Sequence, residues 1–158
     1  MHDIEKNMNG EMLDFREIES PFFLLGLISA FENHYQTKAD NFFEEISWKQ
    51  FFAIICINLC IESPTINELA DIMGSSHQNV KQILNKLEKK GYVQMVSDDK
   101  DKRKQRIMVT EKTNAFCKAH DEGSQIIVKK IFEGIDEKDI ETVIKTLLKM
   151  EKNLEDTE

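Results

Sequence analysis

The chain has 158 residues, of which 41% are hydrophobic and 32% are charged, and its formal net charge is −8. This length and apolar content predict one domain-sized unit with a buried core and exclude a disordered tail. No apolar run reaches the roughly eighteen residues of a membrane span, and the N-terminus lacks the order of a signal peptide. Three cysteines without CxxC spacing fit a reducing compartment. We therefore expect a cytoplasmic protein with no membrane partner.

The first two predicted helices begin at recognisable start signals. Ser20–Pro21 predicts an N-cap followed by the first helical residue, and this helix should end near residues 37–41. Ser47 and Gln50 have the spacing of a capping box, which opens a second helix through about Cys60. Because the second helix is apolar almost all round, we expect it to lie buried at the centre. The apolar stripe of the first helix consists of Leu24, Ile28, Phe31 and Tyr35.

A further capping box, at Thr65 and Glu68, predicts a short helix. Gly74 follows its last apolar residue and supplies the left-handed conformation in which helices often end. Its apolar residues recur at the i, i+3, i+4 and i+7 positions of a single helical face. They are Ile66, Leu69, Ala70 and Met73.

The next predicted helix begins at Ser75 or Ser76, either of which can cap it, and stops at Gly91. Two helices joined by a short turn that contains Gly are typical of a helix-turn-helix, whose second helix enters the DNA major groove. Polar side chains occupy the face opposite the predicted buried stripe. That stripe consists of Val80, Ile83, Leu84 and Leu87.

Two strands follow this helix. Residues 92–97 and 106–110 have the alternating, β-forming character of a hairpin. The segment between them, residues 98–104, is predicted to be too charged to bury. A hairpin with a basic tip, placed directly after a helix that reads DNA, is a wing.

The charge distribution supports a nucleic-acid partner in spite of the negative total. Residues 74–112 contain ten Lys and Arg residues and five Asp and Glu residues, which gives +5. The remainder of the chain therefore carries −13. An acidic body with a basic DNA-contacting region keeps non-specific binding weak while it directs attraction to the groove. The alternative interpretation is a solvated charged face.

Two long helices are predicted after the wing. Thr110 caps the first, which runs through about Phe132 with Gly123 as a weak point or bend, and Gly134 marks a break. Asp136 caps the last helix, whose apolar stripe is too wide for a free surface. A chain of this size offers no partner for this stripe or for the first helix, so we expect a two-fold homodimer. The stripe consists of Ile140, Val143, Ile144, Leu147, Leu148 and Leu154.

The central region resembles the MarR family of winged-helix transcription regulators. The motifs that carry the resemblance are kept in order and spacing over about fifty residues; they are Glu68-Leu69-Ala70, Leu87-Glu88-Lys89-Lys90-Gly91-Tyr92-Val93, Asp101-Lys102-Arg103 and Val109-Thr110-Glu111-Lys112. Two positions depart from the family pattern: Lys100 stands where an Arg is common, and Thr113 stands where a Gly is common. An ammonium at position 100 lacks the two-pronged geometry of a guanidinium.

The fold expected from pattern and resemblance together is mainly α with a small β-hairpin wing. It is a winged helix-turn-helix at residues 42–112, flanked by an N-terminal dimerisation helix region at 1–41 and C-terminal dimerisation helices at 113–158. The resemblance implies that the terminal helices intertwine across a two-fold axis. It also implies that Arg103 contacts phosphate or the minor groove, and that Asp101 holds the shape of the wing with a salt bridge.

The predicted DNA-binding residues fall into two groups. Amides in the first turns of the second helix can pair with adenine at the floor of the major groove, and basic side chains at the hairpin tip can meet phosphates. The recognition-helix residues are Ser75, Ser76, His77, Gln78, Asn79, Lys81, Gln82 and Lys86, and the wing residues are Lys100, Lys102, Arg103 and Lys104.

Other chemistry has weaker support in the sequence. No Gly-rich phosphate loop, HExxH, GxSxG or activated nucleophile is present, so we predict no enzyme and no cofactor. Cys56 and Cys60, one turn apart on the buried helix, are interpreted as core residues with redox sensing as the alternative. Cys117 and His120 have a CxxH spacing without further ligands, so we predict no metal site.

Regulators of this kind often respond to phenolic or other aromatic acids bound between the dimerisation helices and the winged domain. The residues that would line such an effector pocket are His34, Tyr35, Trp48 and Phe116; ordinary core or interface packing is the alternative.

The function predicted is therefore a sequence-specific regulator that binds double-stranded DNA as a homodimer. We expect a repressor that occludes a palindromic operator and is released by a small effector. The alternative is a winged-helix interaction module whose basic helix docks on an acidic protein.

Overall fold

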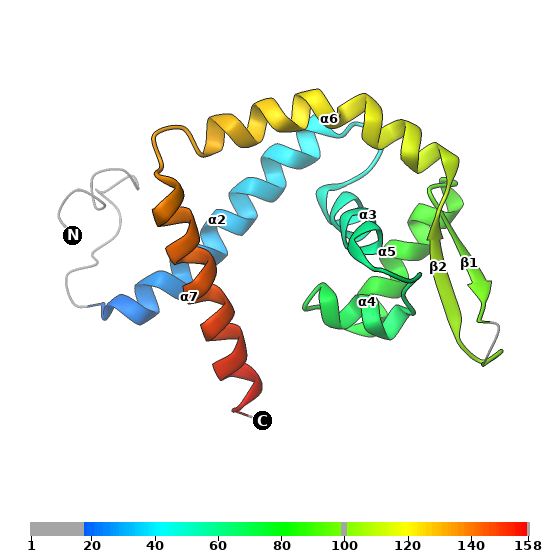
Figure 1. The fold of residues 1–158 in the computed structure, drawn as a ribbon, viewed down its shortest axis with the longest axis horizontal. Coiled ribbons are helices and arrows are strands. Elements are labelled where there is room, and N and C mark those ends of the chain that lie inside the picture. The colour runs from blue at the N-terminus through cyan, green and yellow to red at the C-terminus, as the bar shows by residue number, and fades with distance from the viewer. Residues whose placement is uncertain (1–17, 99–100, 158) are drawn as a thin grey trace. The chain divides into compact units, whose positions relative to one another are not determined.

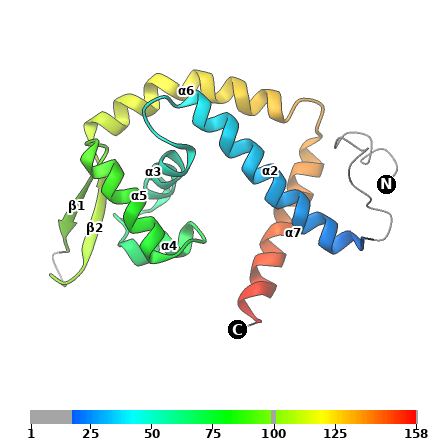
Figure 2. The ribbon, with the colours of Figure 1, turned by 180° about the vertical axis from the view of Figure 1, so that it is seen from behind.

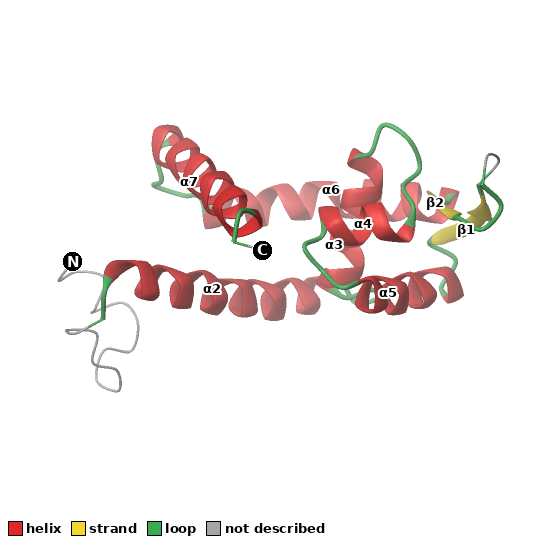
Figure 3. Ribbon diagram, turned by 90° about the horizontal axis from the view of Figure 1, so that it is seen from below, coloured by secondary structure: helices red, strands yellow, loops and turns green. Residues whose placement is uncertain are grey.

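The computed structural model describes residues 18–98 and 101–157 (Figure 1). These residues form six helices and one two-stranded antiparallel sheet, which confirms the mainly helical fold with a single hairpin. Figure 3 shows the two strands of the hairpin in yellow, and in the described ranges an isolated antiparallel bridge also joins Thr65 to Arg106. The described residues divide into two compact units, one that ends at Thr113 and one that begins at Asn114. None of the helices described is both long and apolar enough to span a membrane.

The first two helices start close to the predicted positions. Helix α2 is Ser20–Phe42, but its N-cap is Glu19, so Ser20 is already helical and its predicted capping role is wrong. A Pro in the first turn tolerates this shift, because its missing N–H needs no cap. Helix α3, Trp48–Leu59, opens with the predicted capping box of Ser47 and Gln50. Its buried side includes Ala53 and Ile54.

Helices α4, Ile66–Ile72, and α5, His77–Lys89, form the predicted helix-turn-helix. The capping box of Thr65 and Glu68 opens α4, and Ser76 is the residue that caps α5. Gly74 and Gly91 both have positive φ, 57° and 77°, and each follows the end of a helix. Figure 2 shows α3, α4 and α5 gathered beside the hairpin. The predicted stripe of α5 is buried among them: Val80, Ile83, Leu84 and Leu87.

The hairpin pairs β1, Val93–Ser97, with β2, Gln105–Val109. Its register places Val93 opposite Val109 and Ser97 opposite Gln105. Tyr92, expected in the first strand, lies just before it, where its carbonyl accepts the Thr110 N–H at 3.1 Å. The side chains of Tyr92, Val93 and Ile107 are buried, so the base of the hairpin belongs to the core of the first unit.

Helix α6, Glu111–Ile131, contains the boundary between the units in its first turn, and α7 is Glu137–Glu155. Gly123 was predicted as a weak point or bend; α6 continues through it without a break, since a single Gly costs a helix only about 1 kcal/mol. Gly134, with φ of 77°, makes the predicted break. Asp136 is the N-cap of α7, although its side chain makes no capping hydrogen bond.

Candidate nucleic-acid interface

The first turns of α5 present polar side chains to solvent because the opposite face is buried. His77, Gln78, Asn79, Lys81 and Gln82 are all exposed, whereas Val80 is fully buried. This arrangement follows from the helical period, which places the apolar stripe on one side only. The predicted recognition residues of the first two turns therefore share an accessible surface.

The amides on this surface are not equivalent. The side chain of Asn79 donates to Ser75 Oγ at 2.8 Å, and its backbone N–H donates to Ser76 Oγ at 3.3 Å. The side-chain amides of Gln78 and Gln82 make no hydrogen bond with any described residue. An amide that pairs with adenine needs one donor and one acceptor. Gln78 and Gln82 have both available, while Asn79 has one donor engaged in closing the turn.

Lys86, also predicted to contact DNA, lies farther along the same helix. It follows Gln82 by one helical turn in the direction away from the N-terminus of α5. Its side chain lines a hollow of about 440 Å³ near the start of α3, together with Gln50 and Lys90.

The tip of the hairpin carries an exposed ion pair. Arg103 Nε lies 3.1 Å from Asp101 Oδ1, and the two side chains are 91% and 31% exposed. The Arg103 backbone N–H also donates to Asp101, at 3.2 Å. Hydrogen bonds from the Arg103 side chain, and next from its backbone, lower the pKa of Asp101. Lys102 and Lys104 are exposed beside this pair, and Lys100 lies outside the described residues.

The base of the hairpin carries a second, more buried ion pair that the sequence reasoning missed. Arg106 Nε donates to Asp98 Oδ2 at 2.6 Å, with side-chain exposures of 27% and 9%. The hydrogen bond with Asp98 is the main cause that raises the pKa of Arg106. Asp98 was expected to be too charged to bury, and this expectation is wrong because Arg106 neutralises it. The Asp98 carboxylate also accepts the Asp101 N–H at 2.8 Å, which fixes the start of the tip.

Arg106 further ties the hairpin to the helix-turn-helix. Its Nη1 donates to the Ser63 carbonyl at 2.9 Å and to Glu68 Oε2 at 3.3 Å. Ile107 N donates to the Pro64 carbonyl at 2.9 Å. We call Arg106, Asp98, Glu68 and the Ser63 carbonyl the Arg106 network. It joins the wing to the first turn of α4.

The strand register of the hairpin is the signal from which the Arg106 network could have been predicted. Arg106 lies opposite Val96 in the hairpin, and Asp98 is two residues beyond Val96. Residues two apart on a strand share a face, and diagonal neighbours on paired strands are within reach of long side chains. An Arg and an Asp at these two positions therefore predict an ion pair once the register is known.

The linker between α2 and α3 is fastened near the end of α5. Lys90 Nζ donates to the Glu45 carbonyl at 2.5 Å, and Tyr92 Oη donates to the Glu45 carboxylate at 2.5 Å. Lys112 Nζ lies 3.7 Å from that carboxylate and 4.3 Å from the centre of the Tyr92 ring. Burial and the bond to Glu45 raise the pKa of Tyr92 to about 12. Thr113 Oγ1 donates to the Tyr92 carbonyl and completes this contact.

Two of the four predicted effector residues contact each other. Tyr35 and Trp48 meet edge to face with ring centres 4.7 Å apart, and burial raises the pKa of Tyr35. His34 is exposed. Phe116 belongs to the second unit, where its ring is stacked on His120 at 4.1 Å. None of the four lines the 440 Å³ hollow.

The cysteines are free thiols. Cys60 Sγ donates to the Cys56 carbonyl at 3.2 Å, and burial raises the pKa of the Cys56 and Cys117 thiols. A raised pKa disfavours the reactive thiolate. Within residues 18–98 and 101–157, no three His, Cys, Asp or Glu side chains are grouped to hold a metal ion.

With this geometry established, comparison with known proteins identifies the central region. The model of the MarR family matches residues 57–104, which contain α4, α5, the first strand and the tip of the hairpin. This part of the chain, which holds the helix-turn-helix and most of the hairpin, is therefore similar to the MarR family.

Solved structures of other proteins share the fold over most of the chain. A MarR/EmrR family transcriptional regulator from Acinetobacter sp. ADP1 is similar with a TM-score of 0.77 and 18% identity, covering 88% of this chain and 99% of that one. Streptococcus pneumoniae FabT in complex with DNA is similar at 0.63 and 25%, covering 89% and 100%. The S. aureus MepR–DNA complex is similar at 0.73 and 19%, covering 87% and 99%.

Proposed function

We propose that this chain is a MarR-family regulator and a ligand-responsive repressor that binds a palindromic operator as a homodimer. In this proposal α5 enters the major groove and the hairpin tip contacts the flanking backbone. The observation that carries it is the exposed polar face of α5 beside a basic tip anchored by the Arg106 network. FabT and MepR, which share the fold, were solved in complex with DNA.

Binding of DNA is tested by fluorescence anisotropy on two duplexes of equal length. One carries the palindrome nearest the gene of this protein, and the other is a random sequence. We expect tighter binding to the palindrome, and an affinity that falls steeply as salt rises, because phosphate contacts release counterions. Equal affinity for both duplexes, together with salt-insensitive binding to an acidic protein surface, would favour an interaction module instead.

We assign dimerisation to residues 1–41 and 113–158 and DNA binding to residues 42–112. Large apolar side chains are exposed on both described dimerisation segments, and soluble monomers rarely leave so many uncovered. On α2 they include Phe22, Leu25 and Phe31, and on α7 they include Val143, Ile144, Leu147, Leu148 and Leu154.

A charge placed in this apolar surface should break the dimer. Leu148 is 67% exposed on α7, so Leu148→Glu should not disturb the core of its own subunit. We expect sedimentation to show a dimer for wild type and for Lys149→Glu, an exposed neighbour, and a monomer for Leu148→Glu. A Leu148→Glu protein that remained a tight dimer would show that α7 is not the interface.

The two-fold dimer predicts the form of the operator. Its half-sites should lie about one helical turn, or 10 bp, apart, because both recognition helices must reach the same face of the duplex. Footprinting should protect a compact inverted repeat. A single half-site bound by one subunit would contradict this arrangement.

We propose a phenolic or other aromatic acid as the effector, bound beside Tyr35 and Trp48. The edge-to-face contact of these rings supports the proposal, since aromatic walls are typical of small-molecule pockets. Trp48 is the only Trp of the chain, so its fluorescence reports on this region directly. A phenolic acid that releases operator DNA should also quench Trp48, and release without any change at Trp48 would place the effector elsewhere.

A further inference from the structure

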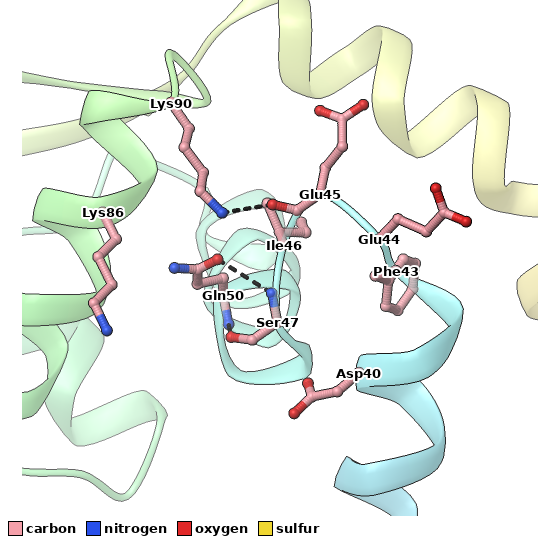
Figure 4. Close-up of a pocket in the computed structure, with 9 residues that line it drawn as sticks. All are labelled: Asp40, Phe43, Glu44, Glu45, Ile46, Ser47, Gln50, Lys86 and Lys90. Carbon is pink, nitrogen blue, oxygen red and sulfur yellow. Dashed lines mark hydrogen bonds between the residues drawn. The ribbon is translucent and has the colours of Figure 1, made fainter.

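A polar hollow lies in the first unit, beside the second half of α5. Its volume is about 440 Å³, within the range of small-molecule sites. Figure 4 shows that it is bordered by the α2–α3 linker, the first turn of α3 and the second half of α5. The residues that line it are Asp40, Phe43, Glu44, Glu45, Ile46, Ser47, Gln50, Lys86 and Lys90.

Gln50 places a hydrogen-bond donor in this hollow. The residue is only 6% exposed, and its Oε1 accepts the Ser47 N–H at 3.1 Å as part of the capping box. Its Nε2 has no hydrogen-bond partner among the described residues, and Figure 4 shows this nitrogen turned toward the side where Lys86 lies. Within the described residues, Ser124 Oγ is the one fully enclosed side-chain N or O atom without a partner, so Gln50 Nε2 reaches the open space of the hollow and can donate to a bound ligand.

Two lysines bring positive charge to the same space. Lys86 lies on α5 and Lys90 is the C-cap of that helix, one turn later, and both line the hollow. Figure 4 shows Lys90 reaching the Glu45 carbonyl and Lys86 extended beside its own helix. No carboxylate of the described residues is within ion-pair distance of the Lys86 ammonium. Lys90 uses one N–H on the Glu45 carbonyl, at 2.5 Å, and an ammonium has three.

The acidic residues of the lining direct their charge elsewhere. Asp40 Oδ1 accepts the Trp48 N–H at 2.5 Å, and the Glu45 carboxylate is hydrogen-bonded to Tyr92. In Figure 4 the carboxylates of Glu44 and Glu45 point away from the space between Gln50 and Lys86. Phe43 and Ile46 are buried and offer little apolar surface. The groups that face the hollow are therefore mainly donors.

We propose that this hollow binds a small anion through its carboxylate or phosphate group. Gln50 Nε2, Lys86 Nζ and a remaining N–H of Lys90 supply three donors, two of them charged, and charge-assisted hydrogen bonds are the strong ones. The scarcity of apolar lining selects a small polar acid over an aromatic one. This site is distinct from the aromatic pair of Tyr35 and Trp48.

A bound anion would also link two parts of the first unit. Gln50 belongs to α3, and the two lysines belong to α5 and its C-cap, so a bound anion joins the linker side of the unit to the helix proposed to read DNA. This consequence rests on the proposed function, whereas binding of the anion itself does not. Binding is therefore measured on the protein without DNA.

The test is a titration of the full-length protein with inorganic phosphate and, separately, with succinate, at constant ionic strength. Amide resonances of residues 44–50 and 86–90 and the Trp48 indole resonance are followed by NMR. We expect at least one anion to shift these resonances in a saturable manner. Which anion saturates at the lower concentration distinguishes a phosphate site from a carboxylate site.

Three variants make the test specific. Gln50→Glu keeps an acceptor for the capping box but replaces the donor with a negative charge, and Lys86→Met keeps the length of the side chain without its charge. Lys89→Met removes the same charge from an exposed neighbour that does not line the hollow. Melting temperatures and circular dichroism confirm that all three are folded.

The expected loss of affinity is about tenfold or more for Gln50→Glu and Lys86→Met, as for one charge-assisted hydrogen bond, and less than about twofold for Lys89→Met. Equal losses in Lys86→Met and Lys89→Met would mean a general charge effect and overturn the site. So would the absence of saturable shifts with both anions, whatever the result of the operator assay.

Discussion

The base and the tip of the wing contain the same kinds of charge in different surroundings. At the base, Arg106 meets a nearly buried Asp98 at 2.6 Å and also holds Ser63 and Glu68. At the tip, Arg103 is 91% exposed and, among the residues that the structure describes, pairs with Asp101 alone, two residues away. Exposed ion pairs contribute little to stability, whereas breaking a buried pair leaves an unpaired charge. The base therefore contributes more to the stability of the wing than the tip does, and we propose that Arg103 exchanges Asp101 for a phosphate when DNA binds.

Removal of the charge at the base should have the largest effect. Asp98→Ala leaves the Arg106 guanidinium without its main partner, and we expect the free energy of unfolding to fall by about 1.5–3 kcal/mol. Urea denaturation measures this. The matched control is Asp101→Ala, which removes the exposed carboxylate of the tip and should leave the urea midpoint almost unchanged. Equal destabilisation by the two variants would contradict the distinction between base and tip.

The second-largest effect is expected for variants of the residues predicted to contact the DNA bases. Gln78→Ala or Asn79→Ala is expected to cost about 1–3 kcal/mol at one base position of the operator, with a loss of specificity. The structure sharpens this prediction, because the Gln78 amide is free and the Asn79 side chain is hydrogen-bonded to Ser75. Affinities for single-base operator variants locate the position that each residue reads. An Asn79→Ala protein with intact operator preference would assign Asn79 to capping alone.

Arg103→Ala tests the tip with a smaller effect. The variant should bind operator and random DNA more weakly to a similar degree, and the salt slope should fall by about one ion per subunit if a phosphate contact is lost. Anisotropy across a salt series measures both quantities. Lys149→Ala, which removes one positive charge from α7 as Arg103→Ala removes one from the tip, controls for total charge. An unchanged slope would remove Arg103 from the interface.

Local signals in the sequence were sufficient for most of this fold. The capping boxes at Ser47 and Thr65, the glycines 74 and 91 and the stripe of α5 depend on neighbours within a few residues, and all were predicted correctly. The Arg106 network was missed because it joins residues 63, 68, 98 and 106 through the hairpin register. The hollow was missed for the same reason, since Gln50 and Lys86 belong to different helices.

Assignment of site residues from the sequence was limited in a similar way. Helical spacing alone places Lys86 on the polar side of α5, but its surroundings depend on the α2–α3 linker, which packs there through Glu45 and Lys90. The spacing of Gln78 and Asn79 likewise does not reveal that one amide is free and the other engaged. Their DNA contacts remain predictions until the variants above are measured.

The smallest effect on stability is expected at the contact between the α2–α3 linker and the base of the wing. It is measured through the pH dependence of the free energy of unfolding. Tyr92 has a pKa of about 12 in the folded chain, above its ordinary value of 10.0, chiefly because it is buried and also because its hydroxyl donates to Glu45. A raised pKa means that the neutral phenol stabilises the fold. This contribution is complete below pH 10 and is lost as pH rises toward about 12, since the unfolded chain ionises first. Tyr92→Phe lacks the titrating group, so the stability difference between wild type and Tyr92→Phe should shrink over this interval. Urea midpoints of the two proteins at a series of pH values measure the difference.

Glu45→Gln should lower the pKa of Tyr92 in a spectrophotometric titration, because it removes the carboxylate that opposes the phenolate. If Glu45→Gln left the Tyr92 titration unchanged, burial alone would raise the pKa of Tyr92. The contact between the α2–α3 linker and the base of the wing would then make no contribution to it.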